Sequence, residues 1–156
     1  MIMSFQTKMS IQPSQKTFPS YRGRRSVRAE SPSLRVTATM EGAHIAEIMH
    51  KESGVTPLWT PPWPSIEPSL YDAASHPEYG GTAESHLLAG IMGHNICLDT
   101  YGGPSEEEAA VGMPIHGEAP TAQYLENGTG DSISLTGMLP MAQVMVLPFH
   151  GAPVRR

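Results

Sequence analysis

Cysteine, basic residues and long apolar segments are all scarce in this sequence. Cys97 is the only cysteine, which excludes an internal disulfide and predicts a reducing, cytoplasmic location. No apolar run approaches the ~20 residues that a membrane-spanning helix needs. The N-terminus also lacks the continuous apolar segment that directs secretion. We therefore expect a cytoplasmic protein with no membrane partner.

Basic side chains are absent from a long part of the chain. None occurs between Glu52 and Val154, where twelve acids are found, whereas seven of the ten basic residues fall within the first 35 positions. Nucleic-acid binding requires clustered cations that neutralise phosphates. The sequence therefore predicts no nucleic-acid partner and no phosphate-specific pocket in this stretch, and it leaves a small neutral sugar as a possible ligand.

Glycine and proline are abundant, with fifteen of each in 156 residues. They are spread along the chain and no helical period is sustained, so the composition predicts short strands joined by tight turns, in an all-β fold. Residues 1–20 show no sustained pattern and predict a disordered leader. The basic composition of residues 1–29 is also typical of a transit peptide. Residues 21–156 are expected to form one partial β-sandwich domain.

Alternation of apolar and polar residues predicts several strands. The clearest runs from Leu34 to Met40, where every second residue is apolar and is expected to face the core, with an arginine and two threonines facing outward. A turn at 41–42 leads into the next strand and forms a hairpin. Ser105 is expected to cap a short helical turn. The remaining strands are expected at 26–30, 44–51, 91–98, 132–136 and 141–147.

Residues 55–70 contain five prolines and both tryptophans. Proline fixes φ and removes a hydrogen-bond donor, so this segment cannot be a central strand or a helix interior and is expected to be an extended loop. Trp59 and Trp63 have two interpretations. They either seal one edge of the core or offer a surface on which a sugar ring stacks.

Residues 86–120 hold the densest set of polar groups able to do chemistry. His116 and Glu118 are two apart, so on a strand they would share a face and form an acid–base couple or two ligands of a metal. His94 and Asp99 would complete a set of four ligands. No spacing typical of a metal site, a P-loop or a dinucleotide fold occurs, so we expect neither a metal nor another cofactor. The other histidines are expected to be surface residues or internally satisfied: His44, His50, His76, His86 and His150.

The run from Arg35 to Pro120 resembles the N-terminal half of aldose 1-epimerase-like proteins, in the galactose mutarotase-like superfamily. The likeness rests on LRVTATMEGAHIAEI, PLWTPPWPSIEP, EYGG, LLAGIMGHNICLD, GGPSEEEAAVGMPIHGEAP and MLPMAQ. The resemblance implies a large antiparallel β-sandwich. It also implies a metal-free reaction in which a histidine acid and a carboxylate base interconvert the anomers of an aldose.

The same resemblance implies that His116 contacts the sugar, and it makes Glu118, His94 and Asp99 candidate sugar-binding neighbours. The family usually has aromatic and arginine residues after its His-Gly element, where this chain has Glu-Ala-Pro, which disfavours a phosphosugar. In the family the catalytic acid and base lie further downstream. We therefore expect an incomplete sandwich, truncated before its catalytic residues, that binds an aldose with little or no epimerase activity. The alternatives are a small noncatalytic carbohydrate-binding module and a metal-dependent β-barrel enzyme.

Overall fold

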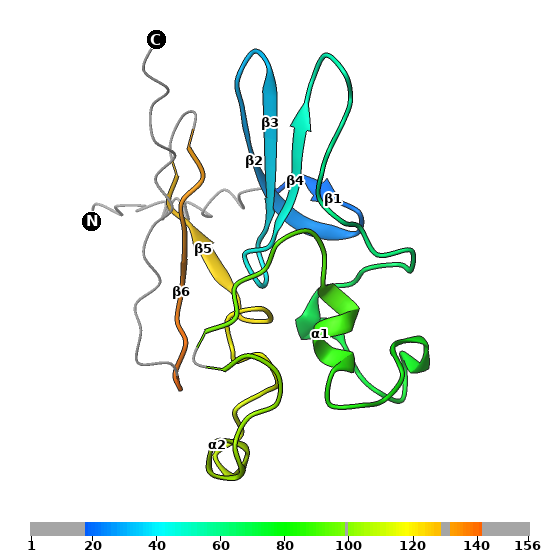
Figure 1. Ribbon diagram of the computed structural model, residues 1–156, viewed down its shortest axis with the longest axis vertical. Coiled ribbons are helices and arrows are strands. Elements are labelled where there is room, and N and C mark those ends of the chain that lie inside the picture. Colours follow the sequence, from blue (N-terminus) through cyan, green and yellow to red (C-terminus); the bar gives the residue numbers. More distant parts are fainter. Residues whose placement is uncertain (1–17, 99, 129–131, 142–156) are drawn as a thin grey trace, which may run out of the picture.

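The computed structural model describes residues 18–98, 100–128 and 132–141, and in them strands predominate over helices. Figure 1 shows the arrangement of the elements. The helical elements are short: the 3₁₀ turns Pro68–Leu70 and Pro77–Tyr79, α1 (Ser85–Gly90) and α2 (Glu106–Ala110). The strands are β1 (Ser20–Tyr21), β2 (Arg24–Glu30), β3 (Leu34–Thr39), β4 (Ile45–His50), β5 (Tyr124–Glu126) and β6 (Leu135–Gly137). The expectation of a β-rich fold is confirmed.

One curled antiparallel sheet organises the described chain. Strands β1 to β4 lie in it in chain order, and β5 pairs with β6 in a separate antiparallel ribbon. Val27 of β2 lies opposite Ala38 of β3, and the register between β3 and β4 shifts between Thr37 and Ala38. Such a bulge bends a strand and increases its twist. In Figure 1 the ribbon lies to one side of β2, β3 and β4, and α1 lies to the other.

The apolar face of the sheet forms a small core. Val27, Ala38 and Met40 are buried there, and Ile133 and Leu135 from the second ribbon pack against them, together with Phe18. Burial declines toward the outer end of the hairpin, where Leu34 is 43% exposed. The prediction that the whole apolar set faces the core is therefore wrong for Leu34, because the ribbon covers only the inner end of β3.

The opposite face of the sheet is polar and also buried. Thr37 and Thr39 were expected to face outward, but both side chains are fully buried. Arg35 donates from Nε and Nη2 to the two carboxylate oxygens of Glu47 at 2.9 and 3.0 Å, and the Thr37 hydroxyl donates to the same carboxylate at 2.9 Å. The hydrogen bond from Arg35 holds the pKa of Glu47 below its usual value. Alternation thus identified the strand, and the polar side chains became buried because they satisfy one another.

The strand predicted at 91–98 is wrong. Residues 85–90 form α1, and in 91–98 only His94 makes a β-bridge, to Ile45 of β4. Gly90 and Gly93 lower helix propensity, and in the structure both lie where the chain packs closely. A Cβ at Gly90 would lie 2.6 Å from the Arg24 guanidinium, and one at Gly93 would lie 2.0 Å from the Ile45 carbonyl oxygen.

Other local predictions have mixed outcomes. The Ser105 cap is confirmed, because its hydroxyl accepts from the Glu108 amide at 3.2 Å and its own amide donates to the Glu108 carboxylate at 2.8 Å. The strand at 132–136 is shifted to β6, and β5 has no counterpart among the predicted strands. The leader up to residue 17 and the strand at 141–147, apart from Met141, lie outside the described residues. Within those residues neither helix has the length and apolar character needed to cross a membrane.

Candidate functional site: a groove beside α1

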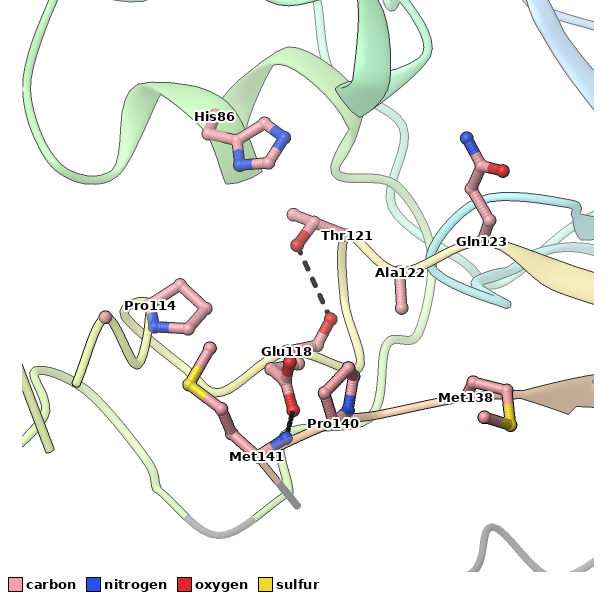
Figure 2. A pocket seen from close by; sticks show the side chains of 10 residues that line it. His86, Pro114, Glu118, Thr121, Ala122, Gln123, Met138, Pro140 and Met141 are labelled. Atoms are coloured by element: carbon pink, nitrogen blue, oxygen red, sulfur yellow. Dashed lines mark hydrogen bonds between the residues drawn. The ribbon is translucent and has the colours of Figure 1, made fainter.

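A groove of about 540 Å³ lies between α1 and the segment 118–123, which leads into β5. Figure 2 shows His86 on one side of it and Thr121, Glu118 and Pro114 on the other. Among the described residues that line the groove, Glu118 is the only acid and none is a lysine or arginine. The lining consists of His86, Gly112, Pro114, Glu118, Thr121, Ala122, Gln123, Met138, Pro140 and Met141.

The segment 118–123 is docked on the turn between β3 and β4. Gly42 donates its amide to the Ala122 carbonyl at 2.7 Å, and the His44 ring lies 2.9 Å from the Pro120 carbonyl oxygen through Nε2. Gly42 has a φ of +75°, and a Cβ there would lie 2.2 Å from that same oxygen. No side chain fits at this position, so the close contact between turn and groove wall depends on glycine.

His44 is fully buried beneath the groove wall and satisfied on both ring nitrogens. Nε2 donates to the Pro120 carbonyl, and Nδ1 accepts the Met92 amide at 3.4 Å. Burial lowers the pKa of His44 to about 4, and the positive charge of Arg24 adds to this effect. The neutral imidazole is therefore a fixed structural connector, as expected for a satisfied histidine.

Glu118 is fixed at both its backbone and its side chain. Its carbonyl accepts the amides of Thr121 and Ala122 at 3.2 and 3.0 Å, which closes a tight turn. Its carboxylate Oε2 accepts the Met141 amide at 2.7 Å, an interaction drawn in Figure 2. The carboxylate belongs to a residue that lines the groove, and this hydrogen bond gives it a defined orientation.

His86 is the groove residue that sequence reasoning set aside. Its exposed ring stacks on Tyr71, with centroids 6.0 Å apart and planes inclined by 23°. The hydroxyl of the neighbouring Ser85 donates to the Tyr79 carbonyl at 2.7 Å and fixes the start of α1. No local sequence signal distinguishes His86 from a surface histidine, because its role depends on a wall that lies 32 or more residues further along the chain.

His116, the residue given most weight in the sequence, is not among the described residues that line the groove. It adopts a left-handed backbone with φ +63° rather than a strand, so His116 and Glu118 do not share a face. The turn is closed by a 3.1 Å hydrogen bond from Gly117 to Pro114. A Cβ at Gly117 would lie 2.1 Å from the Leu98 carbonyl oxygen. The glycine thus serves close packing against the chain and gives no access for a ligand.

The His116 ring is held within its own loop. Its Nδ1 accepts the Gly102 amide at 3.1 Å and lies 3.7 Å from the Cys97 sulfur. Tyr101 packs edge-on, with ring centroids 5.4 Å apart. Burial raises the pKa of Cys97, so its half-buried thiol stays protonated near neutral pH. These contacts join the segment 97–102 to the turn at His116.

His94 does not join Glu118 in the groove. His94 is exposed and outside the groove lining, and its backbone pairs with Ile45 through hydrogen bonds of 2.8 and 3.0 Å. Asp99 lies outside the described residues. In the described part of the chain, no three histidine, cysteine, aspartate or glutamate side chains are arranged to hold a metal ion.

A buried ion network on the polar side of the sheet was not foreseen. Arg24 is fully buried; its Nε donates to Glu67 at 3.0 Å and its Nη2 to the Glu41 carbonyl at 2.7 Å. The Glu41 carboxylate accepts from the Ser69 hydroxyl and amide at 2.7 and 2.8 Å, and from Arg25 at 3.1 Å. Burial lowers the pKa of Arg24, and Glu67 opposes that effect. The network ties β2 to the proline-rich loop.

The groove therefore offers hydrogen-bonding groups of several kinds over an apolar base. An imidazole, a carboxylate, a hydroxyl and an amide line it together with methionine and proline side chains. This composition suits a ligand with many hydroxyl groups and no negative charge. Comparisons with models of protein families, with curated proteins and with solved structures find no match to this chain.

Proposed function

We propose that this protein binds a neutral aldose in the groove between α1 and the segment 118–123. The observation that carries the proposal is the described lining, in which Glu118, His86, Thr121 and Gln123 supply four kinds of polar group and no basic side chain is present. A sugar has hydroxyls that pair with such groups and CH faces that lie against methionine and proline. The volume of about 540 Å³ lies within the range of small-molecule sites.

The proposal includes a relationship to aldose 1-epimerase-like proteins and a sheet that belongs to a galactose mutarotase-like sandwich. Support comes from the resemblance of residues 35–120 and from the antiparallel hairpins β2–β3 and β3–β4, which lie where that resemblance begins. We also place the protein in the cytoplasm, because Cys97 is a free thiol.

Binding is proposed to occur with little or no turnover. Interconversion of anomers requires a positioned acid and a positioned base at the anomeric centre and the ring oxygen. His116, which the resemblance makes a sugar contact, is not among the described groove lining, and its ring contacts the Gly102 amide and the Cys97 sulfur. Polarimetry of freshly dissolved α-D-glucose should give the same mutarotation rate with protein as in buffer. A rate that rises in proportion to protein concentration would contradict this.

Calorimetric titration of the full chain tests the binding itself. D-galactose and D-glucose should bind, and galactose 6-phosphate should bind more weakly because Glu118 repels the phosphate. Glu118→Gln should weaken aldose binding about tenfold or more, because a hydrogen bond to a charged group is lost. Glu52→Gln is the matched control, since Glu52 is an exposed acid outside the described lining. Equal affinity in the two variants, or preference for the phosphosugar, would refute the groove as the site.

A further inference from the structure

We infer that Trp59 is a second carbohydrate contact, a rigid aromatic platform on which the CH face of one pyranose ring stacks. This rests on the proposed carbohydrate specificity and adds a site outside the groove, because Trp59 is not among the described lining residues. The two tryptophans of the proline-rich loop have different environments. Trp59 is 50% exposed, whereas Trp63 is half-buried.

Trp63 serves the fold. Its indole Nε1 donates to the Leu88 carbonyl of α1 at 3.1 Å, so its polar atom is already used. The Trp59 ring meets it in an edge-to-face contact, with centroids 5.7 Å apart and planes inclined by 67°. Within the described part of the chain, the Trp59 indole nitrogen has no hydrogen-bond partner. Trp59 thus keeps both a free donor and free ring surface.

The platform is fixed before any ligand arrives. The Trp59 carbonyl accepts the Gly93 amide at 2.8 Å, and Gly93 is pressed against Ile45 of β4, where a Cβ would lie 2.0 Å from the carbonyl oxygen. Pro61 is buried close by in the same loop and restricts its backbone. Little conformational entropy remains to be lost on binding, which favours stacking at a single exposed ring.

The size of the platform selects the kind of partner. An aromatic side chain buries about 150–250 Å² in full, so a half-exposed tryptophan offers roughly the area of one sugar ring. A stable protein interface needs about 1,000 Å², and proline-rich peptides dock in grooves lined by several aromatics. Val55, four positions earlier in the chain, is also exposed and is a small apolar side chain. An amphipathic ring with a free N–H matches a ligand that is apolar on its face and hydroxylated at its rim.

Fluorescence of a Trp63→Phe variant isolates Trp59 as the only emitter and keeps an aromatic ring beside it. Methyl β-D-galactopyranoside, whose ring stays closed, should change the emission in a saturable manner, and acyclic galactitol should not. The response should persist in Trp63→Phe/Glu118→Gln, because the groove does not contribute to it. An absent response, or the same response to galactitol, would overturn the platform.

Affinity measured by ligand-observed NMR provides the second test and does not depend on emission. Trp59→Ala should weaken glycoside binding at this site about three- to tenfold, and Trp59→Phe should keep most of it. Unchanged binding in Trp59→Ala overturns the inference. The inference is also overturned if the wild-type protein self-associates with rising concentration and Trp59→Ala does not. In that case a second copy of the chain covers the Trp59 ring. A different outcome would refute the groove alone. In that outcome Glu118→Gln binds the aldose as wild type does in calorimetry, and the fluorescence response of Trp59 persists.

Discussion

Acidification should destabilise this protein through His44 in particular. The imidazole is buried and neutral, and its pKa is lowered to about 4 from the ordinary value of 6.5. The unfolded chain takes up a proton below pH 6.5, whereas the folded chain does not until about pH 4. The stability of the folded state is therefore unaffected by this group above pH 6.5 and falls progressively between these two values.

The size of the effect follows from the two pKa values. Between pH 7.5 and pH 5 the lowered pKa of His44 reduces the free energy of unfolding by about 2 kcal/mol. Below pH 4, where the ring is protonated in both states, the loss reaches its limit of about 3 kcal/mol. The physical cause is the site itself. A protonated ring would lose the Met92 amide as a donor to Nδ1, and it would face the positive charge of Arg24 and the neighbouring His94.

Urea unfolding of the full chain at pH 7.5 and pH 5 measures this loss. His44→Gln keeps a donor for the Pro120 carbonyl and cannot titrate, so wild type should lose about 2 kcal/mol more than this variant over the interval. His50→Gln, at an exposed histidine that bonds only the nearby Ser53 hydroxyl through its ring, should retain the wild-type pH profile. Parallel profiles for wild type and His44→Gln would refute the reasoning.

Four further substitutions test the packing, the ion network and the helix cap, each followed by urea unfolding. Gly54→Ala, with φ +68° and no neighbour within 4 Å of a Cβ, should cost ~1–2 kcal/mol from the left-handed backbone alone. Gly42→Ala should cost about 1–3 kcal/mol more because it also clashes with the groove wall; equal losses would contradict that contact. Glu67→Gln leaves Arg24 buried without its countercharge and should cost about 3–5 kcal/mol, and a loss below 1 kcal/mol would mean that the network is hydrated. Ser105→Ala should cost about 1 kcal/mol and speed exchange of the Glu108 amide; unchanged exchange would argue against the cap.

Local sequence patterns predicted the elements whose causes are local. Alternation located β3, and the serine followed by three acids located the start of α2. Sequence patterns failed where contacts with residues far away in the chain determine the local structure. Gly90 lowers helix propensity, yet it is the last residue of α1, and the Arg24 guanidinium occupies the space where a Cβ would be. Arg24 itself looked like one charge in a basic N-terminal stretch, and only the fold places it beside Glu67.

The candidate site was predicted in part. Glu118 lines the groove, but His116, two positions earlier, is not in the described lining, and His116 and Gly117 both have left-handed backbones instead of a strand conformation. Spacing of two residues implies a common face only on a strand. His86 gave no signal, since its partners across the groove come from a segment that no periodicity connects to α1. Sugar binding remains a prediction that the titrations above test. The relationship to aldose 1-epimerase-like proteins also remains a prediction.

The hydrogen bond between His44 and Pro120 also constrains the order in which the protein can fold. Its two residues are 76 positions apart in sequence, whereas β2, β3 and β4 pair through short hairpins. Closing a long loop costs entropy that is recovered only after the distant contact forms. The hairpins should therefore form first and the groove last. During synthesis the groove cannot exist until the segment 118–123 has emerged, so the proposed sugar ligand would act on the final step of folding.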